Sequence, residues 1–91
     1  MARRKNPAPI ITQEAILAMA GQHIQSEIIK LRREGDDLAA KVEAVGRVNE
    51  VEHIRQATEN QVAYHMERLK AVETMYQIQT GTELGMIAEL E

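Results

Sequence analysis

The chain has 91 residues, with no cysteine, tryptophan or phenylalanine and with two tyrosines as its only aromatic residues. Eleven lysines and arginines stand against 14 aspartates and glutamates, which gives a formal net charge of −3. This length allows one small domain, and the lack of cysteine excludes disulfides and thiolate zinc sites. The longest apolar run is Ala15–Ala20, so we expect neither a membrane-spanning segment nor a signal peptide.

Residues 1–11 have the composition of an extended basic arm. Two prolines disfavour helix there, and a cationic cluster precedes them while two isoleucines follow. These residues are Arg3, Arg4, Lys5, Pro7, Pro9, Ile10 and Ile11. We expect the arm to bind a partner through its cations and its isoleucines.

A first helix is predicted from Thr12, a residue type suited to N-capping, with Glu14 in the first turn where the helix dipole favours negative charge. Apolar residues then recur at helical spacing. They are Leu17, Ala20, Ile24, Ile28 and Leu31. Gly35 follows three cations and is predicted to end the helix, which would then be about 22 residues or roughly 33 Å long.

A second helix is predicted from a cap at Asp36 and Asp37 to about Thr80. At about 43 residues, or roughly 65 Å, it is twice as long as the first, so one chain cannot cover its far half. The predicted fold is therefore an all-α antiparallel helical hairpin with a short first helix and a long second helix, completed by oligomerisation. Residues 12–80 form this hairpin domain.

Within the long segment, five apolar residues follow one another at a strict spacing of three: Val42, Val45, Val48, Val51 and Ile54. Such a row moves around a helix by about 60° per step. Either the segment is contacted from several sides, or the helix kinks or breaks near Gly46 to Asn49. A start at Asn49, with Glu52 three residues later, would resemble a capping box.

From Thr58 onward the spacing alternates between four and three, as in the seam of a coiled coil. The seam consists of Thr58, Val62, His65, Leu69, Val72 and Tyr76. Packing against the first helix is one interpretation. Because the long helix lacks a cover, we expect the seam to be the oligomer interface.

Residues 81–91 form an acidic C-terminal tail or a short helix. Glycines interrupt the stretch, and Thr82 is placed to start a last turn that presents Leu84, Ile87 and Leu90. Residues 71–91 contain four glutamates and no lysine or arginine. The chain thus has a basic beginning and an acidic end.

One spacing suggests metal binding. Glu50 and His53 form a Glu-x-x-His unit, which projects a carboxylate and an imidazole from one helical face, as in di-iron bundles. With Glu27 or Glu34 as a third ligand, the pattern resembles two-helix ferritin-like proteins, which implies an iron site shared across a dimer. Glutamate-rich helices place a Glu beside a His by chance, however, so we expect no cofactor and no catalytic residue.

The remaining charges argue against nucleic acid and membrane as partners. Without the arm, 8 basic residues face 14 acidic ones, a net charge of −6 that repels nucleic acid except at the arm. The helices also lack the basic face and aromatic anchors of an interfacial segment.

We therefore expect a non-enzymatic protein–protein interaction or assembly subunit. It would be a small structural, scaffold-like or adaptor protein, of the kind found in phage particles, located in the cytoplasm or in a virion assembled there. Its partners would be other copies of itself and another protein. An alternative is a small inhibitor or regulator that binds a host protein through an acidic helical surface, and a third is the ferritin-like di-iron protein.

Overall fold

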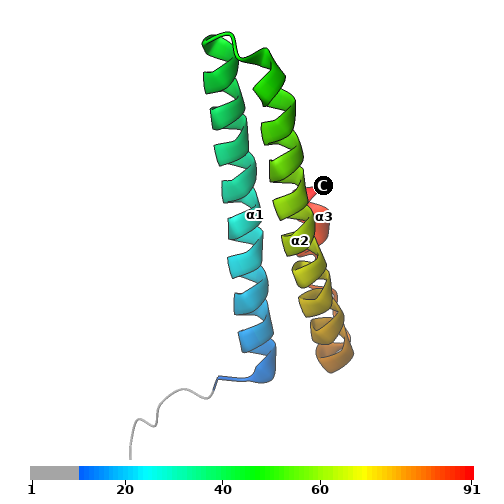
Figure 1. Ribbon diagram of the computed structural model, residues 1–91. Coiled ribbons are helices and arrows are strands. Elements are labelled where there is room, and N and C mark those ends of the chain that lie inside the picture. Colours follow the sequence, from blue (N-terminus) through cyan, green and yellow to red (C-terminus); the bar gives the residue numbers. More distant parts are fainter. Residues whose placement is uncertain (1–10) are drawn as a thin grey trace, which may run out of the picture.

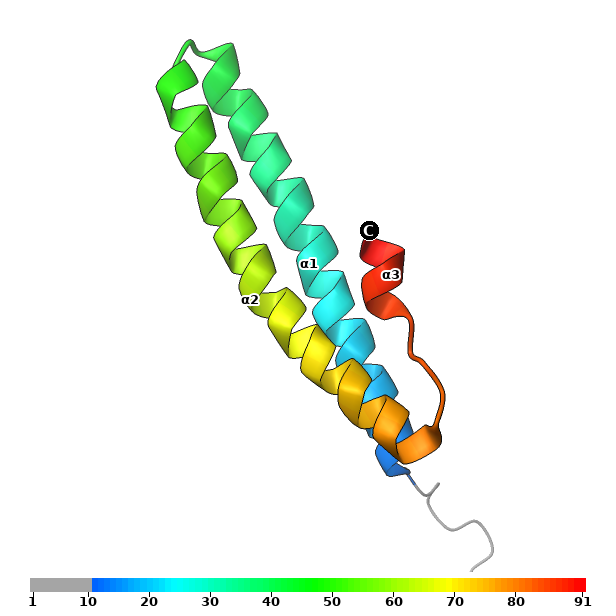
Figure 2. The same cartoon turned by 90° about the vertical axis from the view of Figure 1, so that its right-hand side faces the viewer.

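The computed structural model describes residues 11–91 as three helices (Figure 1). Helix α1 spans Gln13–Ala44, α2 spans Val48–Thr80 and α3 spans Met86–Leu90. The two long helices, of 32 and 33 residues, lie side by side in antiparallel orientation. The short α3 folds back along one face of this pair (Figure 2). All regular structure in the described range is helical, so the predicted all-α hairpin is confirmed.

The start of α1 follows the prediction. Thr12 has an extended backbone, and its side-chain oxygen accepts a hydrogen bond from the Ala15 N–H at 3.1 Å. This bond satisfies one of the free N–H groups that every helix exposes at its first turn. Glu14 lies in that turn, where its negative charge interacts favourably with the helix dipole.

The predicted end of the first helix at Gly35 is wrong, because α1 continues through it to Ala44. Asp36 and Asp37 are exposed residues inside α1 and cap no helix. Gly35 lies seven residues after the buried Ile28 and therefore on the same face of α1. A β-carbon there would lie 2.7 Å from Cγ2 of Thr58 and 3.0 Å from its Cβ. The glycine thus lets α2 approach closely.

The chain reverses direction at Val45–Arg47, within the region where a break was one of the two alternatives. Gly46 has a φ of 82°, which residues with a side chain rarely adopt. Its N–H donates to the Glu43 carbonyl at 3.0 Å, and the Arg47 N–H donates to the Val42 carbonyl at 2.9 Å. The two long helices are therefore equal in length, and the predicted combination of a short and a long helix is wrong.

The predicted cap at Asn49 is also wrong. Helix α2 begins at Val48 after Arg47, whose side chain accepts no capping hydrogen bond. Arg47 instead forms an exposed ion pair with Glu50 in the first turn. The other end of α2 is as predicted: Thr80 is its last residue, and Gly81, with a φ of 73°, donates its N–H to the Gln77 carbonyl at 2.7 Å.

The core is a single apolar stripe between the helices. Its buried residues are Leu17, Ile24, Ile28 and Ala39 from α1, Val62 and Leu69 from α2, and Met86 from α3. Only Ile28 and Leu69 are wholly inaccessible among the large side chains. Each buried Leu, Ile, Val or Met side chain stabilises the fold by roughly 1.5–3 kcal/mol, so six such positions and Ala39 form a small core for a folded domain.

Helix α3 is held against the hairpin by apolar contacts. Met86 is buried, and its Sδ reaches the bare backbone of Gly21 on α1. Leu84, Ile87 and Leu90, the three residues expected in a final turn, pack on the core. The short-helix alternative for residues 81–91 is therefore the observed one.

Three side chains of the long helices add hydrogen bonds to α3. The Gln25 amide donates to the Met86 carbonyl at 3.3 Å, and the Arg32 guanidinium donates to the Leu90 carbonyl at 3.0 Å. The Glu73 carboxylate accepts from the Ile87 N–H at 2.8 Å. These bonds satisfy backbone groups that a five-residue helix cannot satisfy internally, and they fix α3 over both long helices.

The contact between Gly35 and Thr58 gives a first prediction. Gly35→Ala gains about 1 kcal/mol in helix propensity but overpacks a tight contact, which typically costs about 1–3 kcal/mol. We expect a net loss of about 1 kcal/mol in unfolding free energy, measured by urea titration of the helical circular dichroism. In a Thr58→Ala background, which removes Oγ1 and Cγ2, the same change should be neutral or stabilising. Equal effects in both backgrounds would contradict the close contact.

Candidate interaction surfaces

The seam predicted as an oligomer interface lies between the two long helices. Val62 and Leu69 are 2% and 0% exposed, and the other four members, Thr58, His65, Val72 and Tyr76, are half-buried. Because α1 is nearly as long as α2, it covers the whole length of the seam within one chain. The seam thus packs against the first helix, the alternative interpretation, and another copy could reach Val62 and Leu69 only by opening the hairpin.

This burial changes what a mutation in the seam should do. We expect Leu69→Asp to unfold the chain, because a carboxylate at a fully buried site costs more than about 4 kcal/mol, comparable with the total stability of a small domain. Loss of helical circular dichroism would show this. A folded Leu69→Asp variant with a smaller mass in light scattering would instead favour the seam as an oligomer interface.

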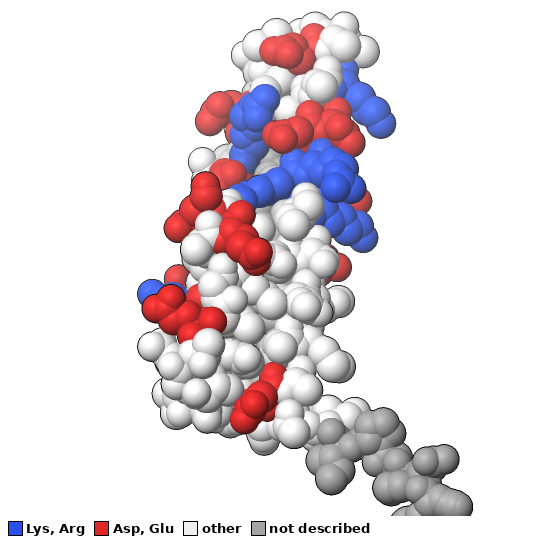
Figure 3. All heavy atoms as spheres, turned by 180° about the vertical axis from the view of Figure 1, so that it is seen from behind, with Lys and Arg blue, Asp and Glu red and all other residues white. Residues whose placement is uncertain are grey.

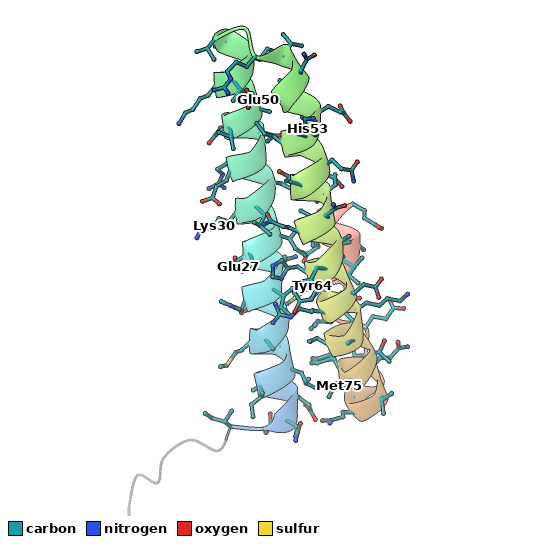
Figure 4. All side chains as sticks on the ribbon, viewed as in Figure 1. Glu27, Lys30, Glu50, His53, Tyr64 and Met75 are labelled. Carbon is teal, nitrogen blue, oxygen red and sulfur yellow. The ribbon has the colours of Figure 1, made fainter. Side chains whose placement is uncertain are left out.

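The metal-ligand candidates are not brought together within the chain. Glu50 and His53 lie near the turn, whereas Glu27 lies near the middle of α1 (Figure 4). Along α1, Glu27 is about 24 Å from the level of Glu50, and the Glu50 carboxylate already pairs with Arg47. Within residues 11–91 no three acidic or histidine side chains gather closely enough to hold a metal ion. Any site would need ligands from outside the described chain.

The arm lies almost entirely outside the described residues. Of its predicted partner-binding side chains, Arg3, Arg4, Lys5 and Ile10 fall in residues 1–10, which the structure does not describe. Ile11 is described and is 62% exposed just before the start of α1. Ile11 therefore lies at the end of the hairpin opposite the turn (Figure 1).

That end of the hairpin carries little charge. Residues 11–26 and 71–80 contain only Glu14 and Glu73 as charged residues, whereas residues 27–70 contain eight cationic and nine anionic ones. Viewed from behind, most of the visible lysines and arginines lie on the half nearer the turn (Figure 3). Five large apolar side chains are exposed at the weakly charged end: Ile11, Ile16, Met19, Met75 and Ile78. We call these five residues the apolar end.

An acidic groove of about 540 Å³ runs between α2 and α3. Four glutamates line it against one lysine, Lys70. The glutamates are Glu67, Glu73, Glu83 and Glu91. Its floor is apolar, with Met66, Leu84 and Ile87 among the lining residues. The groove therefore combines negative charge with apolar surface, which suits a segment carrying cations and aliphatic side chains.

The face of the hairpin opposite α3 is open. Two shallow hollows of about 230 and 410 Å³ lie along it, lined by Leu31, Glu34, Gly35, Leu38, Ile54, Ala57, Thr58, Asn60, Gln61, Tyr64 and His65. Tyr64 is 65% exposed. The Arg68 guanidinium lies 5.8 Å from the centre of the Tyr64 ring and donates a 3.0 Å hydrogen bond to Nδ1 of His65. We call this surface the open face.

Comparison of the chain with protein-family models, with curated protein sequences and with solved structures found no significant match. No helix in the described part of the chain is long and apolar enough to cross a membrane.

Proposed function

We propose that the chain is a non-enzymatic protein–protein interaction and assembly subunit, a small structural, scaffold-like or adaptor protein. The observation that carries this proposal is the apolar end, where Ile78 is 78% and Met19 57% exposed in a region with almost no charge. Exposed apolar side chains on a surface with little charge are the kind of surface that another protein covers. Incorporation into a phage particle assembled in the cytoplasm is the setting that we propose for it.

The basic arm and the acidic groove give this subunit a second means of contact. The arm carries three cations and two isoleucines, and the groove offers four carboxylates around an apolar floor. We propose that the arm of one subunit binds the groove of another subunit, or a similar surface on a partner protein. Exposed ion pairs contribute only about 0–1 kcal/mol each, so binding depends on several pairs and on burial of the isoleucines together.

The acidic groove also favours a second candidate function. A small inhibitor or regulator would use the same groove to cover a basic site on another protein. In that case the groove would be needed for binding and the arm would not. Removing each of them separately therefore distinguishes the two functions.

Deleting residues 2–9 tests the role of the arm. We expect the helical circular dichroism and thermal midpoint to change little, because the hairpin core lies within residues 17–86, while association beyond the smallest oligomer is lost. Sedimentation velocity of the full and shortened chains at low and high salt measures this. If the shortened chain unfolds, the arm is part of the core. If its association is unchanged, the arm does not have the proposed role.

The groove can be tested with the arm as a separate peptide. A labelled peptide of residues 1–11 should bind the shortened chain in fluorescence anisotropy and lose affinity as salt shortens the screening length to about 3 Å at 1 M. Glu67→Lys combined with Glu83→Lys should weaken this binding. Glu43→Lys, an exposed glutamate near the turn, is the control and should not. Equal weakening by all the variants would indicate general charge attraction only.

A further inference from the structure

The open face is an uncovered apolar surface on a domain with a small core. Helix α3 packs on one face of the hairpin, and the other face, toward the viewer in Figures 1 and 4, has no helix over it. Leu38 and Met75 on this side are 49% and 48% exposed. The surface runs the whole length of the hairpin, and its charged residues include Glu27, Glu34, Lys41, Glu50 and Arg68.

We propose that two copies of the chain pack their open faces together about a twofold axis parallel to the helices. Each α1 then lies beside α2 of the second copy, and the dimer is a four-helix bundle in which neighbouring helices are antiparallel. The inference names the self-association surface of the proposed assembly subunit and rests on that proposal.

The register of the hairpin determines which residues meet in this dimer. Gly35 lies opposite Thr58 and Asp36 pairs with Arg55, so residue numbers at one level add up to about 93. An axis parallel to the helices keeps residues at their own level. Each residue of α1 therefore faces the residue of the partner's α2 for which the two residue numbers add up to about 93.

In this register the charges of the two open faces are complementary except at Glu34, which meets the partner's Ala57 and Gln61. Glu27 meets the partner's Arg68, and Lys41 meets the partner's Glu50, each within about two residues or 3 Å of the same level. Symmetry repeats both pairs, which gives four ion pairs between the copies. The apolar residues also match, because Ile16 meets the partner's Met75 and Leu38 meets the partner's Ile54 and Ala57.

A twofold axis perpendicular to the helices gives a poorer match. It would place α2 against α2 of the second copy. The two helices overlap along their whole length when a residue of one α2 and the residue facing it on the other have numbers that add up to about 129. Arg68 would then face the partner's Gln61, and Glu50 would face the partner's Gln79. Neither charge of α2 finds an opposite charge there, although Glu27 of α1 faces the partner's Lys30. The perpendicular axis thus gives two ion pairs against four and places the weakly charged ends far apart, so the parallel axis is favoured.

The area of the open face suffices for a stable dimer. Two helices about 48 Å long and about 10 Å apart present on the order of 900 Å² per chain. Stable interfaces bury about 800 Å² per partner. Covering Leu38, Tyr64 and Met75 would also enlarge the small core of the single hairpin.

The full chain should therefore sediment with the mass of two chains at micromolar concentration. Ala57→Glu places a carboxylate on the open face and should raise the dissociation constant of the dimer by roughly tenfold or more, since uncompensated charge at an interface core is costly. Ala63→Glu, an equally exposed alanine on the other side of α2, is the matched control and should leave the mass unchanged. A wild-type mass of one chain, or equal effects of both variants, would overturn the proposal.

A charge exchange tests the register without touching apolar residues. Glu27→Arg places two arginines at each contact between identical chains, and Arg68→Glu places two glutamates there, so each variant alone should dimerise weakly. A mixture of the two variants restores both opposite-charge contacts and should recover the mass of a dimer. In the perpendicular arrangement Glu27 faces Lys30 instead, so the mixture would keep one repulsive contact, and failure to recover the dimer would overturn the proposed axis.

These outcomes are separable from those of the assembly proposal. Deleting residues 2–9 should leave the dimer mass intact, because the open face is formed by residues of α1 and α2. A dimer that survives while arm binding is absent supports the open face and contradicts the role of the arm. Arm-peptide binding by a chain of monomer mass contradicts the open face and retains the assembly role.

Discussion

The close contact of Gly35 with Thr58 is the constraint on which the rest of the structure depends. A side chain at residue 35 would collide with Thr58, so the glycine lets the two long helices approach at this level and sets which residues face each other. Ile28 and Leu69 are both fully buried in the stripe that results. The turn at Gly46 closes the hairpin in that same register, because its φ of 82° allows a three-residue connection.

The same register leaves the hairpin with two different faces. Helix α3 occupies one face because Gly21 makes room for Leu84 and Met86, while Gln25, Arg32 and Glu73 bond its backbone. The opposite face keeps half-buried and exposed apolar residues with no element of the described chain over them. A pair of helices buries side chains only along one stripe, so each of its two faces stays exposed unless another element packs on it. Helix α3 supplies that layer on one side only.

Local rules predicted the ends of the hairpin better than its middle. The cap at Thr12 and the end at Thr80 follow from neighbouring residues and occur as expected, whereas the short C-terminal helix begins at Met86 and not at Thr82 as predicted. The error at Gly35 arose because a glycine after several cations is also typical of a helix end. Its spacing of seven from Ile28 placed it on the buried face, and this tertiary role outweighed the local preference. The valine row at a spacing of three contains the turn, and a break near Gly46 was one of the two alternatives that it left open.

The interaction surfaces needed the fold before they could be assigned. The seam from Thr58 to Tyr76 was identified correctly as an apolar stripe, but its partner depends on the length of α1, and that length depends on residue 35. The acidic groove joins Glu67 and Glu73 of α2 to Glu83 and Glu91 beside or beyond α3, a proximity that sequence spacing does not reveal. The open face became visible only once α3 was known to cover the other side.

The two proposed contacts lie on different faces, and their symmetries differ. Contact between open faces is isologous, since each copy offers the same surface, and it closes after two chains. Contact between an arm and a groove is heterologous, since one copy gives the arm and another receives it, and such contacts continue into rings or filaments unless the rotation closes. The groove lies between α2 and α3, away from the open face, so a dimer retains two free grooves and two free arms. A closed dimer that is extended through its arms is therefore the form of assembly that this arrangement of charge and apolar surface favours.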